Sequence, residues 1–284
     1  MRKCTIALTA VLVAVVLAQS ASVQADSAQQ AFSDGKALLT KADFNGALQA
    51  FARAARADNT NQEYFQHYAM VRQVITLRQR LKTEQDPARW EYLASGLHAF
   101  FVSQGIYSEA LVLDRQVHAR LKTAASAAML AETQLALNLD AEAAAVLSEL
   151  NETEATPSTL ALLGIALARQ GKIEDARQVA EGIQLPDTGK PGMVYNVARL
   201  QAASGNADEA ISLLQRCFES VPPSRLDGFK AHAKACPDFS ELASTTAFAK
   251  VLETKSKVPE SKCSGGSGCG NCPMRGKCPK SQGQ

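Results

Sequence analysis

The chain has 284 residues, of which 46% are hydrophobic, 20% charged and 6% aromatic, and its formal net charge is +2. A balance this close to neutral gives no indication of a polyanionic partner such as nucleic acid, and we expect none. Alanine and leucine dominate the apolar residues, and this composition favours helices.

The first 25 residues have the pattern of a cleaved export signal. Arg2 and Lys3 precede an uncharged run over residues 5–18, and small residues at 23–25 suit a signal peptidase. The run is shorter than the about 20 residues of a bilayer-spanning helix, which disfavours the alternative of a retained anchor. We therefore expect an exported chain, periplasmic or secreted, that begins at Asp26 and has no membrane span. Removing Arg2 and Lys3 reduces the 30 basic residues to 28, which equals the 28 acidic residues.

Paired amphipathic helices are predicted from residue 26 to residue 253, the expected repeat domain. The predicted pairs are 29–40 with 45–57, 90–103 with 107–121, 125–137 with 141–150, 158–169 with 173–182, and 192–203 with 207–220. They make up units near 28–61, 91–123, 124–156, 157–190 and 191–224. Between the first two units, residues 62–90 predict one long helix that ends before Pro87. This segment is either an irregular insertion or a degenerate unit.

A short sequence motif centred on an alanine recurs in the second helix of each pair. The five alanines are Ala47, Ala110, Ala143, Ala176 and Ala210, and the last three intervals between them are 33, 33 and 34 residues. A period near 34 is typical of a helix–turn–helix solenoid, in which each unit buries its apolar face against its neighbours. Turn glycines precede three of the alanines by five residues, and Asn138 holds the equivalent place before a fourth. The glycines are Gly105, Gly171 and Gly205.

With these residue types recurring at equivalent repeat positions, the chain resembles the tetratricopeptide repeat family over about residues 28–224. Further matches are small residues on first helices and a closing proline, namely Gly35, Ala131, Gly164, Ala198 and Pro222. The resemblance implies an all-α, right-handed helical solenoid of about five helix pairs. It also implies an interaction scaffold for another protein or a peptide segment rather than an enzyme. His98 occupies a repeat position at which the other units have a small residue. The helices of the unit from residue 91 are therefore expected to be splayed or locally shifted.

The resemblance further implies a concave partner-binding groove lined by first helices. Its positions here are Tyr92, Ser95, Glu132, Leu135, Arg169, Tyr195, Asn196 and Arg199. The last three make the most persuasive cluster, because one helical face offers a ring, an amide and a guanidinium that could grip a peptide backbone or a carboxylate. A purely solvated polar face is the alternative.

After residue 224 the pattern predicts a cap over 225–253 and a flexible tail over 254–284. A helix near 226–235 and two short helical turns would cover the last apolar face of the repeats. The tail has a glycine- and serine-rich composition that is typical of a linker. It is also basic, since six basic residues face Glu260 alone: Lys255, Lys257, Lys262, Arg275, Lys277 and Lys280.

Four of the cysteines crowd into the tail: Cys263, Cys269, Cys272 and Cys278. In an exported protein an even set of cysteines favours disulfides, here two of them. The alternative is a four-thiolate site for zinc or an iron–sulfur cluster. That alternative would make the protein a metal- or redox-responsive adaptor that acts through its tail.

The helical body holds two further cysteines and four scattered histidines. We expect Cys217 and Cys236 to form a disulfide between the last full unit and the cap, with two buried thiols as the alternative. The histidines show no metal-binding spacing, and no catalytic sequence such as GxSxG or HExxH is present. The sequence therefore predicts neither catalysis nor a cofactor outside the cysteine tail.

Overall fold

A computed structural model describes residues 26–259 except residues 152 and 188. All regular secondary structure in these residues is helical, which confirms the predicted all-α fold class. The chain divides into two compact units that meet between Leu139 and Asp140, and each is described by itself. The predicted signal peptide, 1–25, lies outside the described residues, as does the chain from residue 260 onward.

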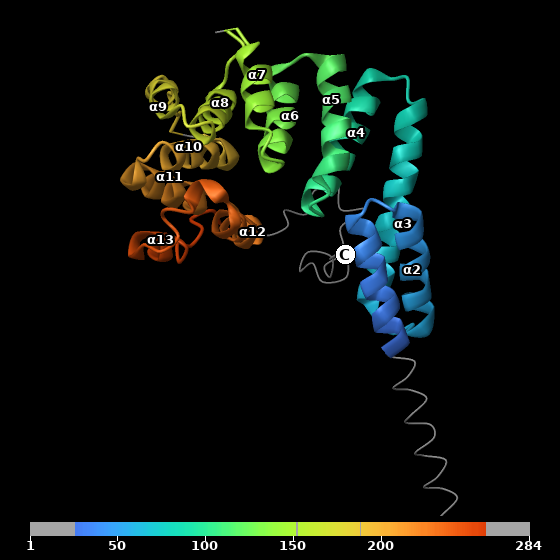
Figure 1. The fold of residues 1–284 in the computed structure, drawn as a ribbon. Helices are drawn as coiled ribbons and strands as arrows, with labels where there is room; N and C mark the ends of the chain where they lie inside the picture. The colour runs from blue at the N-terminus through green and yellow to red at the C-terminus, as the bar shows by residue number, and fades with distance from the viewer. Residues whose placement is uncertain (1–25, 152, 188, 260–284) are drawn as a thin grey trace, which may run out of the picture. The chain divides into compact units, whose positions relative to one another are not determined.

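Unit 1 consists of a helix over residues 26–40 and five further helices (Figure 1). These are α2 (Phe44–Ala57), α3 (Gln62–Thr83), α4 (Pro87–Ser103), α5 (Tyr107–Leu121) and α6 (Ala124–Ala136). The long helix expected after the first pair is α3, with 22 residues. It packs against α2 before it and α4 after it. The core of this part is aromatic, because Phe32, Phe51 and Tyr64 are buried together.

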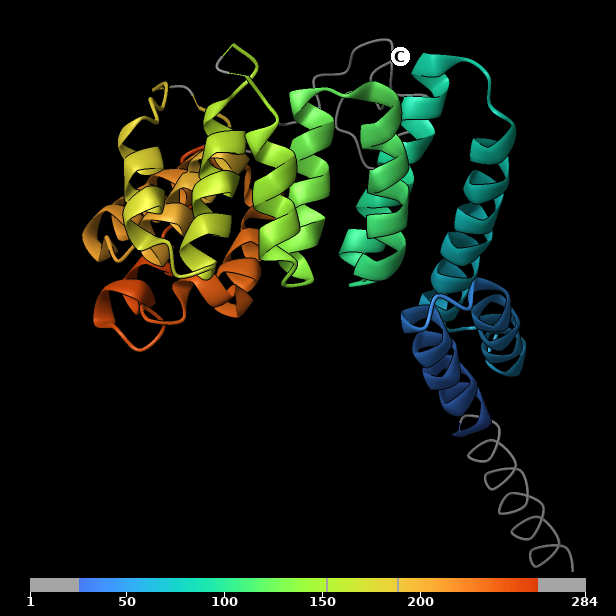
Figure 2. The same ribbon diagram turned by 45° about the horizontal axis from the view of Figure 1, so that its top comes forward.

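Unit 2 contains three further helix pairs or partial pairs and the predicted cap (Figures 1 and 2). Its elements are α7 (Asp140–Ser148), α8 (Pro157–Arg169), α9 (Ile173–Glu181), α10 (Pro191–Ala203), α11 (Ala207–Ser220), α12 (Pro223–Ala235), the 3-10 helix η1 (Pro237–Phe239) and α13 (Thr246–Val251). Helix α8 packs against α7, α9 and α10, and α10 packs against α11. The cap divides its contacts, since η1 lies on α10 while α12 and α13 lie on α11.

Local sequence explains where the first helices begin. A proline occupies the start of α4, α8, α10 and α12, where its missing N–H group would be unpaired in any case. Thr123 and Thr156 cap α6 and α8 and form capping boxes with Ser126 and Thr159. Each start is thus fixed by residues within one helical turn of it.

The turns within pairs use left-handed backbone at the positions expected. Gly105, Gly171 and Gly205 have φ values of 68°, 79° and 87°. Asn138, in the place of the missing glycine, has φ 58°. Asparagine tolerates this region better than most residues, so the substitution preserves the turn.

The repeat alanines lie inside the two units. Each of the five has a relative exposure of 0%. On the facing first helices, Gly164 of α8 is packed so closely that an added Cβ would lie 2.5 Å from Leu200 Cδ1. Small side chains therefore set the separation of neighbouring helices, as the repeat pattern predicts.

In unit 1, His98 fills the place of the small residue with a polar network. Its Nδ1 lies 2.8 Å from Asp114 Oδ1, and the Thr133 hydroxyl donates to Asp114 Oδ2 at 2.6 Å. Asp114 has no exposed surface. The network joins α4, α5 and α6, and it gives both oxygens of the buried carboxylate a partner.

Substitution of Gly35 tests the packing of unit 1. An added Cβ would lie 2.6 Å from Cε1 of Phe51, whose ring is fully buried. We expect Gly35→Ala to lower the free energy of unfolding by about 1–3 kcal/mol through overpacking. Gly96→Ala in α4 is the control, since nothing lies within 4 Å of its added Cβ. That variant should gain about 0.5–1 kcal/mol from helix propensity. Urea unfolding followed by circular dichroism measures both, and equal shifts would contradict this packing of Phe51.

Candidate functional site

Two of the groove residues predicted in unit 2, Arg169 and Arg199, converge on the carboxylate of Asp238, and Arg169 Nη1 also lies 3.5 Å from Asp140 Oδ1. Arg169 Nε lies 2.7 Å from Asp238 Oδ1, and Arg199 Nε lies 2.8 Å from Oδ2. The Asp238 side chain is 1% exposed, and those of Arg169 and Arg199 are 14% and 10% exposed. Because Asp238 belongs to η1, the two ion pairs fix the cap onto α8 and α10. We call these three residues the Asp238 clamp.

Electrostatics keep the Asp238 clamp ionised. Burial alone would raise the pKa of Asp238, but the charge of Arg199 and the hydrogen bond and charge of Arg169 lower this pKa below its ordinary value. Burial likewise opposes the charged form of Arg199, and Asp238 more than offsets it, so the pKa of Arg199 is raised. The Asp238 carboxylate therefore bridges two cations, and both shifts favour the charged forms.

Aromatic side chains pack around Tyr195, one helical turn before Arg199 on α10. The ring of Tyr195 packs edge-on against Phe229, His232 and Phe239, with centroids 5.6, 5.4 and 5.8 Å away. Its hydroxyl lies 2.6 Å from Nδ1 of His232. Burial and the nearby charge of Arg199 lower the pKa of His232, and burial raises the pKa of Tyr195. Both shifts favour the neutral forms, so the contact is a hydrogen bond between a neutral hydroxyl and a neutral imidazole.

The structure places this cluster differently from the predicted open groove. Tyr195, Asn196 and Arg199 are 5%, 6% and 8% exposed, beneath the cap rather than facing solvent. The Asn196 amide accepts from Arg199 Nη1 at 3.3 Å and donates to Ser158 at 3.4 Å. The cluster does grip a carboxylate, as its chemistry suggests, but that carboxylate belongs to the same chain.

The groove positions of unit 1 lie in different surroundings. Tyr92 is 79% exposed on α4. Ser95, Gly96 and Ala99 follow it at helical spacing and are also exposed. We call these four residues the α4 face. Glu132 on α6 is exposed as well, whereas Leu135 is buried.

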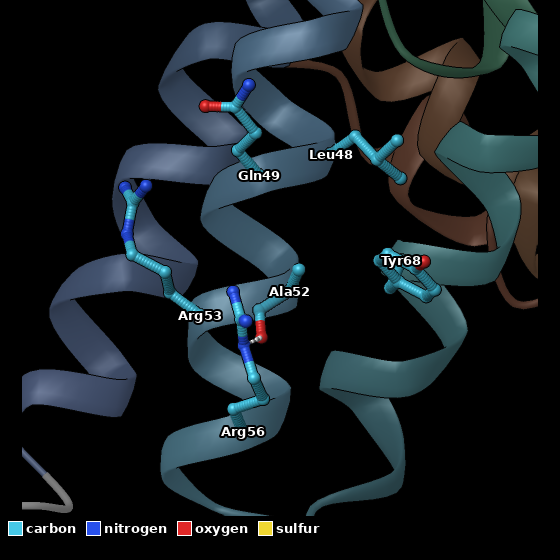
Figure 3. Close-up of a pocket in the computed structure, with 6 residues that line it drawn as sticks. All are labelled: Leu48, Gln49, Ala52, Arg53, Arg56 and Tyr68. Carbon is cyan, nitrogen blue, oxygen red and sulfur yellow. Dashed lines mark hydrogen bonds between the residues drawn. The ribbon is translucent and has the colours of Figure 1, made fainter.

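A hollow that the sequence analysis did not foresee lies between α2 and α3 (Figure 3). Its volume is about 410 Å³, and it is lined by Leu48, Gln49, Ala52, Arg53, Arg56 and Tyr68. Five of these residues form one side of α2, next to the buried side that carries Ala47, Phe51 and Ala54. In the sequence, Gln49 with Arg53 and Ala52 with Arg56 have only the i, i+4 spacing of any exposed helix side, so no local signal pointed to the hollow.

The cysteines of the helical body are free thiols, so the expected bridge between Cys217 and Cys236 is absent from the structure. Each thiol contacts a different acceptor: Cys217 donates to the Pro191 carbonyl at 3.3 Å, and Cys236 to Asp238 Oδ2 at 3.4 Å. Burial raises the pKa of Cys217 to about 12 and also raises that of Cys236. Two buried thiols, the alternative to the bridge, describe this part of the chain.

The predicted chemistry of the tail stays a prediction, because Cys263, Cys269, Cys272 and Cys278 lie outside the described residues. Between residues 26 and 259, no group of three or more histidine, cysteine or acidic side chains could hold a metal ion. In the same range, no helix is both long and apolar enough to cross a membrane.

Comparisons with known proteins yield a likeness among solved structures but none among sequence families. No family model matches the chain, and no curated protein matches it. Among solved structures it is similar to the crystal structure of YrrB, described as a TPR protein with an unusual peptide-binding site. The match covers 66% of this chain and 83% of the other, with 17% identity and a TM-score of 0.30. A score this low does not carry the binding site of YrrB over to this chain.

The Asp238 clamp is tested by removing its negative charge. We expect Asp238→Asn to lower the free energy of unfolding of unit 2 by about 3–5 kcal/mol, because Arg199 is left buried without a counter-ion. Glu219→Gln is the control, since it breaks a surface pair in which the Lys257 side chain is 73% exposed, and it should cost less than about 1 kcal/mol. Because the folded pKa of Asp238 is lowered, its contribution is present above about pH 4 and is lost as the pH falls further. Urea titrations should therefore show that the difference in unfolding free energy between wild type and Asp238→Asn becomes smaller in acid. Equal stability of wild type and Asp238→Asn at neutral pH would refute the clamp.

The two buried thiols are tested by alkylation of the unreduced protein. In the folded chain we expect Cys217 and Cys236 to react slowly with iodoacetamide, because both are buried and their pKa values are raised. In denaturant, without any reductant, both should be alkylated completely, as peptide mass spectrometry would report. Protection that persists until a reductant is added would instead establish the disulfide.

Proposed function

We propose that the protein is a non-catalytic scaffold that binds a segment of another protein through unit 1. The observation that carries this proposal is the location of exposed apolar side chains. Among the described residues the large ones are Phe65, Tyr92 and Val112, which are 44%, 79% and 55% exposed. All three belong to unit 1.

The α4 face is the surface best suited to such binding. Tyrosine is enriched among residues that dominate binding energy, since a ring and a hydroxyl are both presented at low entropic cost. Small residues beside Tyr92 allow a partner backbone to approach closely, and the Cβ position of Gly96 has no neighbour within 4 Å. The α4 face thus combines an anchor with open space around it.

The corresponding face of unit 2 supports the same assignment by contrast. Tyr195 on α10 is the counterpart of Tyr92 as a first-helix tyrosine, but the cap encloses it. Binding there would require Asp238 to leave two guanidinium groups. We therefore assign partner binding to unit 1 and a closing role to the cap.

Export is part of the proposal. The sequence of residues 1–25 supports cleavage before Asp26 and release into a periplasmic or extracellular space. We propose no cofactor for the helical units, and no nucleic acid as partner.

Site-specific photocrosslinking tests the proposed surface. With benzoylphenylalanine in place of Tyr92, irradiation of the producing cells should give one discrete protein adduct. The same photoreactive residue in place of Glu209, which is exposed in unit 2, is the control and should give none. Tyr92→Ala should weaken binding of the protein identified in the adduct by about tenfold or more. Absence of an adduct at 92, or the same adduct at both positions, would contradict the proposal.

A further inference from the structure

The hollow between α2 and α3 contains two guanidinium groups with no carboxylate partner among the described residues. Arg53 is exposed and forms no hydrogen bond or ion pair within residues 26–259. Arg56 donates one bond, from Nε to the Ala52 carbonyl oxygen at 3.1 Å. The Nη1 and Nη2 groups of Arg56, and the entire guanidinium group of Arg53, remain available to a ligand.

The acidic residues nearest in sequence are engaged elsewhere. Asp58 Oδ1 accepts from the backbone N–H and the hydroxyl of Thr60, at 3.0 and 2.7 Å. Asp43, at the other end of α2, accepts from the N–H of Gly46 at 2.9 Å. No acidic residue lies between them, so α2 contributes positive charge alone to the hollow.

The opposite side of the hollow is apolar. Figure 3 shows Leu48 and Tyr68 on one side and the two arginine side chains on the other. Phe65 lies one turn before Tyr68 on α3 and is 44% exposed, so it extends the same side of that helix. A ligand in the hollow would meet guanidinium groups along one edge and apolar surface along the other.

We propose that this hollow binds an acidic segment of a partner protein. A carboxylate of the segment bonds to Arg53 and Arg56, and an adjacent apolar side chain packs on Leu48 and Tyr68. A guanidinium presents its donors in a planar fork that matches a carboxylate, which makes arginine well suited to this contact. The inference rests on the proposed function, in that both require a protein partner, but it uses a surface distinct from the α4 face.

Charge complementarity selects this occupant. The chain's own tail is excluded because residues 254–284 carry six basic residues against Glu260. Nucleic acid is disfavoured because it requires a wide basic surface with many phosphate contacts. Here the half-buried Asp58 and the exposed Glu63 lie between the arginines and Tyr68 in the sequence and limit the basic surface to two side chains. The apolar edge offers no contact to a phosphate backbone.

Fluorescence anisotropy with the full chain tests the proposal. The probe is a short labelled peptide that alternates glutamate with leucine, and the reference peptide has glutamine in place of glutamate. We expect the glutamate peptide to bind at least about tenfold more tightly than the glutamine peptide. Arg53→Glu combined with Arg56→Glu should abolish this preference, and Tyr68→Ala should weaken binding of both peptides.

The matched control reverses two exposed charges that lie outside the hollow, near the C-terminal end of α3. Arg80→Glu with Lys82→Glu changes the net charge equally, at about 18–21 Å along the helix from Tyr68, and should alter binding less than twofold. An equal loss in both double variants, or tighter binding of a single-stranded oligonucleotide of equal charge, would overturn the proposal. Circular dichroism confirms folding, and the milder pair Arg53→Gln with Arg56→Gln should reproduce the loss. If the hollow fails this test while Tyr92 still crosslinks a partner, the proposed function stands without it.

Discussion

Both units depend on helices approaching each other at positions where a larger side chain would not fit. The repeat alanines have no exposed surface, and Gly164 of α8 leaves room for Leu200 of α10. A branched side chain at such a position would push two helices apart and uncover apolar surface on both. The capping residues and turn glycines only decide where each helix begins and ends. The small residues decide how far apart the helices lie, and therefore which larger side chains can meet.

Closure of unit 2 adds a second constraint, because its cap is held by charge as well as by apolar contact. Asp238 is buried between Arg169 and Arg199, while Phe239 beside it packs on Tyr195. Burying three charges costs free energy of desolvation, which the ion pairs and hydrogen bonds must offset. An apolar cap could settle in several positions, whereas a carboxylate must meet both guanidinium groups at once. We infer that the Asp238 clamp determines where the cap sits more than how tightly it is held.

The sequence predicted the helices closely because the signals that set them are local. Pro157 and Gly171, for example, bracket α8 within a few residues of its ends. The fate of Arg199 could not be predicted in this way, because its partner Asp238 is 39 residues away and is one of 28 acidic residues. Periodicity indicated which face of α10 is polar, but not what covers that face. Tyr92 and Tyr195 make the point together, since both occupy first helices and one is 79% exposed, the other 5%.

The two arginine pairs of the chain differ in how their charge is balanced. Arg169 and Arg199 receive a carboxylate from the cap of their own unit, and the side chain that carries it is 1% exposed. Arg53 and Arg56 have no such carboxylate among the described residues, and the chain beyond residue 254 adds further positive charge rather than negative. On α2 the pair looks like an ordinary solvated face, which is why periodicity alone gave no reason to single it out. Its distinguishing feature is three-dimensional: Tyr68 of α3 closes the hollow opposite the arginines, so that a carboxylate bound there would also bring its neighbouring side chain onto apolar surface.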